Sequence, residues 1–416
     1  MRPLSRRQFL TLSTLTAAAA GLVAGSSRLH ALDWLAPADA QAEPSGPPIK
    51  IGIIDPLSSP YKTSSIHDVH GATVALEAFN KRGGVLGRPV TLIEVDDGSN
   101  VETATRAAMK LIQDDHVDVL MGTFNGDVAL AVGELAQRHD KLFMVTGAHV
   151  PELTGANCRK HVFVFMPNAI MLAQAVAPAL VKAYGTKIFM VTAETVDGRS
   201  AEAAMREALV AQNAEIVGVA TTPFGATDFT AALTQAKDAK PQIIVLNLYG
   251  WDLVNALKAY GKLEFAKEKI GIGGLIAGEQ IGRPLGYANN AGIWGLIWDP
   301  KINTESSRRF IQGVIDKYNH TPTSRCYLGY AAMTQILEAI QRAGSTETSA
   351  LIKELQGHEF DGLKEGKSYF RFSDHQHVQD VLVGQAYGKE LGLGHYQILS
   401  TLRGDAVAGA PRGCTL

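Results

Sequence analysis

The stretch from Ile49 to Asn100 constrains the fold more than any other part of the chain. Ile49–Ile54 is a short apolar run with little polar alternation, which is typical of a strand buried on both faces of a parallel sheet. A helix capped by Asp68 is expected next, because apolar residues recur there at steps of three and four. Val90–Val95 is a second apolar run. The stretch predicts a strand–helix–strand unit, with the loop Asp55–His67 at the rim of a ligand site.

Strand and helix patterns alternate along the rest of the chain, which is typical of doubly wound parallel sheets. Further strands are predicted at Val117–Met121, Leu142–Val145, Val162–Phe165, Lys187–Val191, Ala214–Val219, Gln242–Leu246, Lys269–Gly273, Ala291–Trp298 and Val378–Tyr387. Helices are predicted, among others, at Val128–His139, Ala169–Tyr184, Glu202–Gln212, Leu253–Tyr260, Glu305–Tyr318 and Tyr327–Ala343, and the chain is expected to close with an irregular tail. A chain of 416 residues is too long for one ordinary core, so two similar α/β halves in tandem are predicted.

The first unit also carries a family resemblance. Its strand, SxPY loop, helix with AxxxxN, KRGGVLGRP turn, second strand and DD pair resemble the type I periplasmic solute-binding proteins of ABC transporters, in the leucine/isoleucine/valine- and amide-binding group. The resemblance covers nearly the whole chain after the amino-terminal region. It implies an α/β fold of two Rossmann-like lobes joined by three crossings around a hinge. It assigns residues 49–166 with 299–370 to lobe 1, residues 167–298 with 371–402 to lobe 2, and residues 403–416 to a tail.

The amino terminus matches a twin-arginine export signal. Ser5-Arg6-Arg7-Gln8-Phe9-Leu10 precedes a mildly apolar run, although Thr11 stands where lysine is common. Small residues predict removal of the signal near Ala40 or Ala42, so residues 1–46 are assigned to signal and linker, and the product is expected in the periplasm. The alternative is a disordered basic tail.

Charge and cysteine content narrow the function classes. A net charge of −2 gives no broad electrostatic footprint for nucleic acid. Only Cys158, Cys326 and Cys414 are present, and none lies in a CxxC motif. The resemblance implies a Cys158–Cys414 disulfide, because relatives carry cysteines at both places; three unpaired thiols are the alternative.

Catalytic motifs are missing from the sequence. It contains no GxSxG, HExxH or GxxxxGK[ST], so no enzyme activity and no cofactor are expected. His67 with His70, and His375 with His377, lack carboxylate or cysteine partners at ligand spacing. We interpret these as surface loop histidines and predict no metal site.

A solute-binding site is expected where loops follow parallel strands. Free backbone N–H groups at the starts of the following helices suit a carboxylate or another acceptor. From the first lobe, the candidates are Tyr61, Ser64, Asn125, Gly126, Asp127, Ala148 and His149. From the second lobe, they are Asp197, Tyr249, Trp251 and Ile276.

The resemblance implies roles for several of these residues. Asn125-Gly126-Asp127 stands where amino-acid binders have a serine-rich turn for the α-carboxylate, and Ala148-His149 stands where they have a small residue and threonine. Tyr249 stands where these binders have an aromatic lid residue, and Trp251 is a second aromatic residue beside it. Asp197 stands where they have a second lid tyrosine. The acidic partner of the α-ammonium falls near Ile276, which carries no charge. These differences from the amino-acid binders do not favour a free branched-chain amino acid as the solute.

Several of these candidates could instead have a purely structural role. Asp127 could cap a helix, and Asp197-Gly198 could form only a turn. Tyr249 and Trp251 could be packing residues, and Tyr61 could lie exposed on the surface.

The leading hypothesis is a monomeric periplasmic receptor that captures a small polar, amino-acid-like or aromatic-acid solute and delivers it to an ABC permease. The alternatives are a ligand-sensing subunit for a membrane kinase and a periplasmic enzyme whose cofactor is loaded before export.

Overall fold

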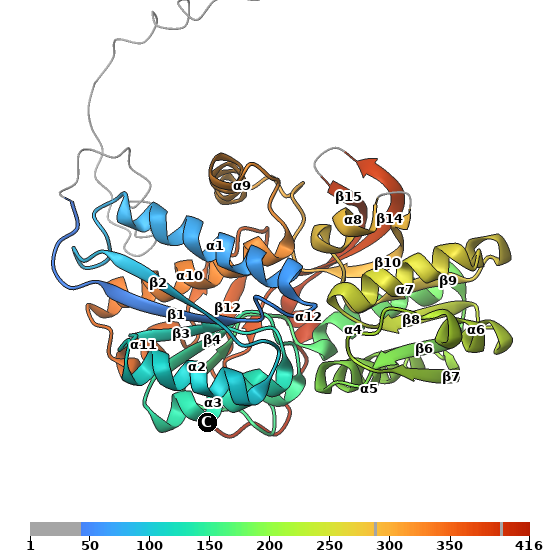
Figure 1. Ribbon diagram of the computed structural model, residues 1–416, viewed down its shortest axis with the longest axis horizontal. Helices are drawn as coiled ribbons and strands as arrows, with labels where there is room; N and C mark the ends of the chain where they lie inside the picture. The colour runs from blue at the N-terminus through green and yellow to red at the C-terminus, as the bar shows by residue number, and fades with distance from the viewer. Residues whose placement is uncertain (1–42, 287–288, 392–393) are drawn as a thin grey trace, which may run out of the picture. The chain divides into compact units, whose positions relative to one another are not determined.

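The computed structural model describes residues 43–286, 289–391 and 394–416. The twin-arginine motif and both predicted cleavage positions therefore lie outside the described residues. Strands of the described chain form two larger sheets and one small sheet (Figure 1). Within the described residues, no helix is both long and apolar enough to cross a membrane.

The first sheet is parallel, with the strand order β2-β1-β3-β4-β5. Its strands are β1 (Ile49–Asp55), β2 (Val90–Asp96), β3 (Val119–Gly122), β4 (Leu142–Val145) and β5 (Val162–Val164). The isoleucines of β1 are fully buried because helices cover both faces of the sheet. The helices of this lobe are α1 (Lys62–Asn80), α2 (Val101–Gln113), α3 (Gly126–Arg138), α9 (Glu305–Tyr318), α10 (Ser324–Ala343) and α11 (Thr348–Leu355).

The second sheet has the order β15-β14-β10-β9-β8-β6-β7. It contains β6 (Lys187–Ala193), β7 (Glu215–Thr222), β8 (Ile243–Asn247), β9 (Gly271–Gly274), β10 (Ala291–Leu296), β14 (Val381–Leu391) and β15 (Gly394–Leu402). The first five are parallel to one another, and β14 and β15 are antiparallel additions at one edge. The helices that pack here are α4 (Ala169–Tyr184), α5 (Val196–Val210), α6 (Thr230–Asp238), α7 (Gly250–Lys262) and α8 (Glu279–Leu285). The predicted α/β fold with two lobes is confirmed.

Shorter elements complete the chain. They are η2 (Pro151–Thr154), η3 (Phe265–Glu268), the small antiparallel sheet of β11 (Glu359–Phe360), β12 (Ser368–Phe370) and β13 (His377–Val378), and α12 (Gly404–Ala408).

The three segments that pass from one large sheet to the other are hydrogen-bonded to one another. The ammonium group of buried Lys364 donates to the carbonyl oxygens of Ile297 (2.9 Å) and Asp380 (2.7 Å), and to the Gln379 side chain (2.6 Å). Gln379 in turn donates to the carbonyl oxygen of Phe165 at 2.9 Å. Burial lowers the pKa of Lys364 to about 7. Lys364 thus links the second and third crossings directly, and Gln379 links them to the first.

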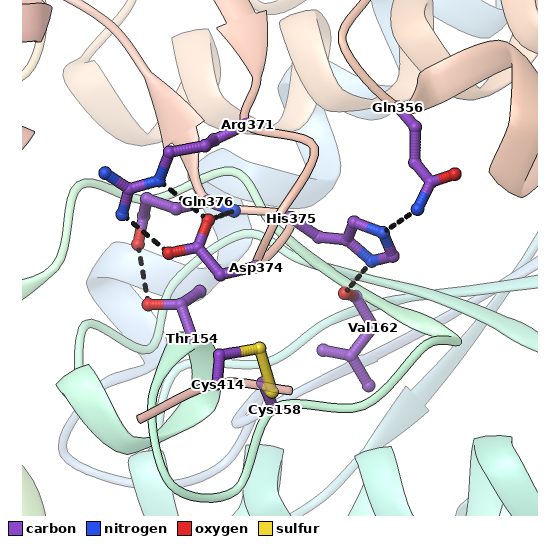
Figure 2. The surroundings of a disulfide bond; sticks show 9 residues. All are labelled: Thr154, Cys158, Val162, Gln356, Arg371, Asp374, His375, Gln376 and Cys414. Atoms are coloured by element: carbon purple, nitrogen blue, oxygen red, sulfur yellow. Dashed lines mark hydrogen bonds and ion pairs between the residues drawn. A yellow bond between two sulfur atoms is a disulfide. The ribbon is translucent and has the colours of Figure 1, made fainter. Parts of the chain in front are cut away.

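A disulfide ties the carboxyl-terminal segment to the first lobe. Cys158 and Cys414, the pair implied by the resemblance, are joined with an S–S distance of 2.03 Å (Figure 2). Beside the bond, Arg371 makes a bidentate ion pair with Asp374 (2.9 and 2.6 Å). Cys326 is a buried free thiol.

Five helices begin earlier than predicted. They are α1 at Lys62 instead of after Asp68, α3 at Gly126 instead of Val128, α5 at Val196 instead of Glu202, α7 at Gly250 instead of Leu253, and α10 at Ser324 instead of Tyr327. Their first turns consist mostly of polar and small residues, a composition typical of loops. Thr195 and Thr323 cap α5 and α10, and tertiary packing overrides the weak helix propensity of the first turns.

Two further sequence interpretations are wrong. Asp68 is not a helix cap but lies inside α1, where its carboxylate accepts a hydrogen bond from the Thr146 hydroxyl. The stretch after Tyr387, predicted to be irregular, contains β15, which pairs with β14. As an edge strand with many exposed residues, β15 carries little of the apolar pattern that marks a buried strand.

Candidate functional site

Loops from both lobes meet at the carboxyl ends of the parallel strands. The backbone N–H of Gly126, in the first turn of α3, donates to Oδ2 of Asp197 in α5 at 2.8 Å. Nε2 of His149, after β4, lies 2.8 Å from the hydroxyl oxygen of Tyr249, which precedes α7. We call these four residues, Gly126, His149, Asp197 and Tyr249, the interlobe junction. The structure brings these four predicted site residues together.

His149 is neutral in this setting. Burial and, secondarily, the positive charge of Arg325 lower its pKa to about 3. Its Nδ1 lies 3.6 Å from Oδ1 of Asp197. Because the imidazole is uncharged, this approach is not an ion pair, and Oδ1 of Asp197 has no hydrogen-bond partner among the described residues.

Asp197 lies in the first turn of α5 rather than in a turn before a helix. Burial raises the pKa of its carboxyl group to about 7, and the Gly126 hydrogen bond only partly opposes that rise. The neighbouring charge of Asp127 raises it further. Asp197 therefore holds a proton over much of the range in which an exposed carboxyl group is ionised.

We expect Asp197→Asn to stabilise the protein increasingly as pH rises from 5 to 8. The unfolded carboxyl group releases its proton near pH 4 and the folded one near pH 7, so wild-type stability falls over that interval. The free-energy cost of ionising Asp197 in the folded protein is on the order of 4 kcal/mol above pH 7, and asparagine avoids this cost. Urea unfolding of both proteins at pH 5, 6, 7 and 8 measures the difference.

Asp228→Asn is the matched control, because Asp228 is exposed and its pKa is lowered by hydrogen bonds with Thr230. Its effect should not vary across this pH range. A pH-independent effect of Asp197→Asn would contradict the burial argument.

Tyr61 is buried rather than exposed on the surface. Its side chain is 3% exposed and stacks on Phe124, with ring centroids 4.3 Å apart. It also contacts the second lobe at Gly250, where an added Cβ would lie 2.5 Å from the Tyr61 ring. Glycine at that position permits the close approach. Ser64 is buried in the following turn of α1.

The other candidates divide into buried and peripheral residues. Asn125, Ala148 and Ile276 are buried, and Oδ1 of Asn125 has no hydrogen-bond partner among the described residues. Asp127 is exposed, and it is not the helix cap, because α3 has Asn125 at that position. Trp251 packs against the second-lobe core, with the Lys258 ammonium 5.6 Å from its ring centroid.

Arg325, in the first turn of α10, was not among the site residues predicted from the sequence. Its side chain is only 4% exposed, and its guanidinium carbon lies 4.2 Å from the centroid of the Phe124 ring. Among the described residues, Nη1 of this group has no hydrogen-bond partner. A buried donor without a partner is costly, so a ligand acceptor is expected there. Arginine is unfavourable at the positive end of a helix, and that was the sequence signal that could have identified it.

Buried acids surround the guanidinium group. Asp68, Asp55 and Asp197, in that order, favour its charged form, while burial lowers its pKa. Burial also raises the pKa of Asp68 to about 6, and burial with repulsion from Asp68 raises that of Asp55. Arginine stays charged at neutral pH. The site thus presents one fixed cation beside acids that readily hold protons.

The prediction that the two histidine pairs lie in surface loops is wrong. His67 and His70 lie on α1, partly buried. His375 and His377 are fully buried and hydrogen-bonded to the carbonyl oxygens of Val162 and Phe165, respectively (3.1 Å each), the former in Figure 2.

The chain is similar to known proteins over most of its length. Residues 48–390 match the family model described as periplasmic binding protein. Leu/Ile/Val-binding protein homolog 7 of Brucella suis biovar 1 (strain 1330) is 23% identical over 365 residues, which is 84% of this chain and 91% of that protein. A periplasmic binding protein from Burkholderia mallei has a TM-score of 0.80 and 24% identity, covering 86% of this chain and 96% of its own. A solute-binding protein of an ABC transporter from R. palustris in complex with benzoate has a TM-score of 0.79 and 21% identity. The match covers 89% of this chain and 100% of that one.

Proposed function

Because the chain belongs to the periplasmic binding protein family, whose members are solute-binding receptors rather than enzymes, we propose that it captures a small organic acid between its two lobes for an ABC importer. The observation that carries the proposal is the buried Arg325 guanidinium with its unpartnered Nη1. A carboxylate satisfies that donor with a charge-assisted hydrogen bond, which is about twice as strong as a neutral one.

The rest of the site favours an acid that also carries a hydrogen-bond donor. Oδ1 of Asn125 is a buried acceptor and Oδ1 of Asp197 is a buried carboxyl oxygen, and neither has a hydrogen-bond partner among the described residues. A hydroxyl group of the solute would satisfy either atom. Tyr61, Phe124 and Tyr249 supply aromatic surface next to the same polar atoms. We therefore propose a hydroxylated aromatic acid as the solute class, and the benzoate held by the R. palustris relative supports an aromatic acid.

A thermal-shift panel tests this function. Benzoate, 4-hydroxybenzoate, benzamide, leucine and putrescine are compared at equal concentrations, because a ligand raises stability by RT ln(1 + [L]/Kd). We expect the largest shift with 4-hydroxybenzoate and none with benzamide, which has the same shape as benzoate without its charge. A shift with putrescine or leucine alone would contradict the proposed solute class.

The remaining parts of the proposal come from the sequence. We propose export by the twin-arginine route with removal of the signal near Ala40 or Ala42, delivery of the solute to an inner-membrane permease, and action as a monomer without a cofactor. The proposed lobes are residues 49–166 with 299–370, and 167–298 with 371–402.

A further inference from the structure

Three histidines from two distant segments meet on the first lobe. His67 and His70 lie on α1, and His320 lies in the connection between α9 and α10, 250 residues after His70. Each ring offers a nitrogen atom, and these three nitrogens all lie within 4.8 Å of one another. All three residues are partly buried. None of them belongs to the interlobe junction.

One of the three ligand distances is that expected on a metal ion. Nδ1 of His70 lies 3.2 Å from Nε2 of His320, and these two atoms are hydrogen-bonded. Two nitrogens bound to one Zn²⁺ at tetrahedral angles lie roughly 3.4 Å apart, given Zn–N bonds of about 2.0–2.1 Å. The ring centroids lie between 4.9 and 5.7 Å apart, so the rings can converge on a common point without overlapping.

Neighbouring groups orient the rings. Nδ1 of His320 lies 2.9 Å from the Thr321 carbonyl oxygen. A carbonyl oxygen only accepts, so Nδ1 carries the hydrogen and Nε2 keeps its lone pair. Metal-binding histidines almost always donate their second ring N–H in this way. His70 is held by stacking on Tyr318, with ring centroids 3.7 Å apart.

We propose that His67, His70 and His320 bind one divalent transition-metal ion, a function separate from solute capture. Imidazole ligands suit Zn²⁺, Cu²⁺ and Ni²⁺. On binding, the Nδ1 proton of His70 moves to its Nε2 through solvent, so all three rings stay neutral and Nδ1 gains a free lone pair. Water takes the fourth position. The ion links α1 to the α9–α10 connection, where the Thr321 carbonyl oxygen also accepts a hydrogen bond from Arg283 of α8 at 2.6 Å.

The experiment is a calorimetric titration of the tag-free, EDTA-treated protein with ZnCl₂, without solute. We expect one Zn²⁺ per chain and a rise of the thermal midpoint. His320→Ala and His67→Gln should each weaken zinc binding at least about tenfold. His139→Ala is the matched control, because His139 is also partly buried but lies at the end of α3, and it should bind zinc like the wild type.

Co²⁺ provides a second readout, since tetrahedral Co²⁺ absorbs in the visible range. We expect this absorption in the wild type and its loss in both cluster variants. Absence of zinc binding by the wild type, or unchanged binding in a folded His320→Ala protein, would overturn the site. Neither result bears on the solute panel, so failure of this site and failure of the proposed function are distinguishable.

Discussion

Replacing Arg325 with methionine is expected to weaken binding of the organic acid by about 10- to 100-fold. A hydrogen bond to a charged group contributes about 1.5–3 kcal/mol, and each 1.4 kcal/mol changes affinity tenfold. Methionine keeps much of the apolar contact with Phe124 but supplies no donor for a carboxylate. Isothermal titration with the acid that gives the largest thermal shift measures the loss.

Two further variants make this result specific. Arg106→Met removes a positive charge from an exposed position of α2 and should leave the affinity unchanged. Arg325→Lys keeps the charge but not the planar fork, so it should recover only part of the affinity. Wild-type affinity in a folded Arg325→Met protein would show that the solute carboxylate does not meet this residue.

Substituting alanine for Gly329 is expected to destabilise the protein by about 3 kcal/mol, the upper part of the range for overpacked interiors. An ideal Cβ at Gly329 of α10 would lie 1.9 Å from the carbonyl oxygen of Asp68 in α1. The facing residue Gly71 is equally constrained, since its Cβ would lie 1.9 Å from the carbonyl oxygen of Cys326. Backbone cannot rotate away as a side chain can, so the helices would have to separate. Urea unfolding measures the change.

The matched control is Gly261→Ala in α7. There the nearest atom to the added Cβ is Oδ1 of Asn289 at 3.5 Å, an ordinary contact. We expect this change to be neutral or to stabilise by up to about 1 kcal/mol, because alanine has the higher helix propensity. Equal stability of the Gly329→Ala and wild-type proteins would contradict the close helix contact.

Much of the fold could be predicted from the sequence because buried strands carry their own pattern. The apolar runs that form β1, β4 and β8 predict strands without any knowledge of the neighbouring strands. The first residues of the helices were harder to predict from the sequence. The first turns of α1 and α10 are polar, and they are helical because the two helices pack closely through Gly71 and Gly329.

The site was only partly predictable for a related reason. Loops after parallel strands converge by topology, so the sequence pointed to His149, Asp197 and Tyr249, and the structure brings them together. Arg325 follows no strand, and it reaches Phe124 only because α10 returns to the first lobe after the second crossing.

By itself, the sequence determined the α/β class, the two lobes and the loops that meet between them, since periodicity and chain order are local properties. The tertiary structure alone decided which distant groups became neighbours, as in the guanidinium of Arg325 beside Phe124 and the three histidines on the first lobe. Contacts between residues about 200 or 250 positions apart depend on how helices pack, and no spacing along the chain records that packing.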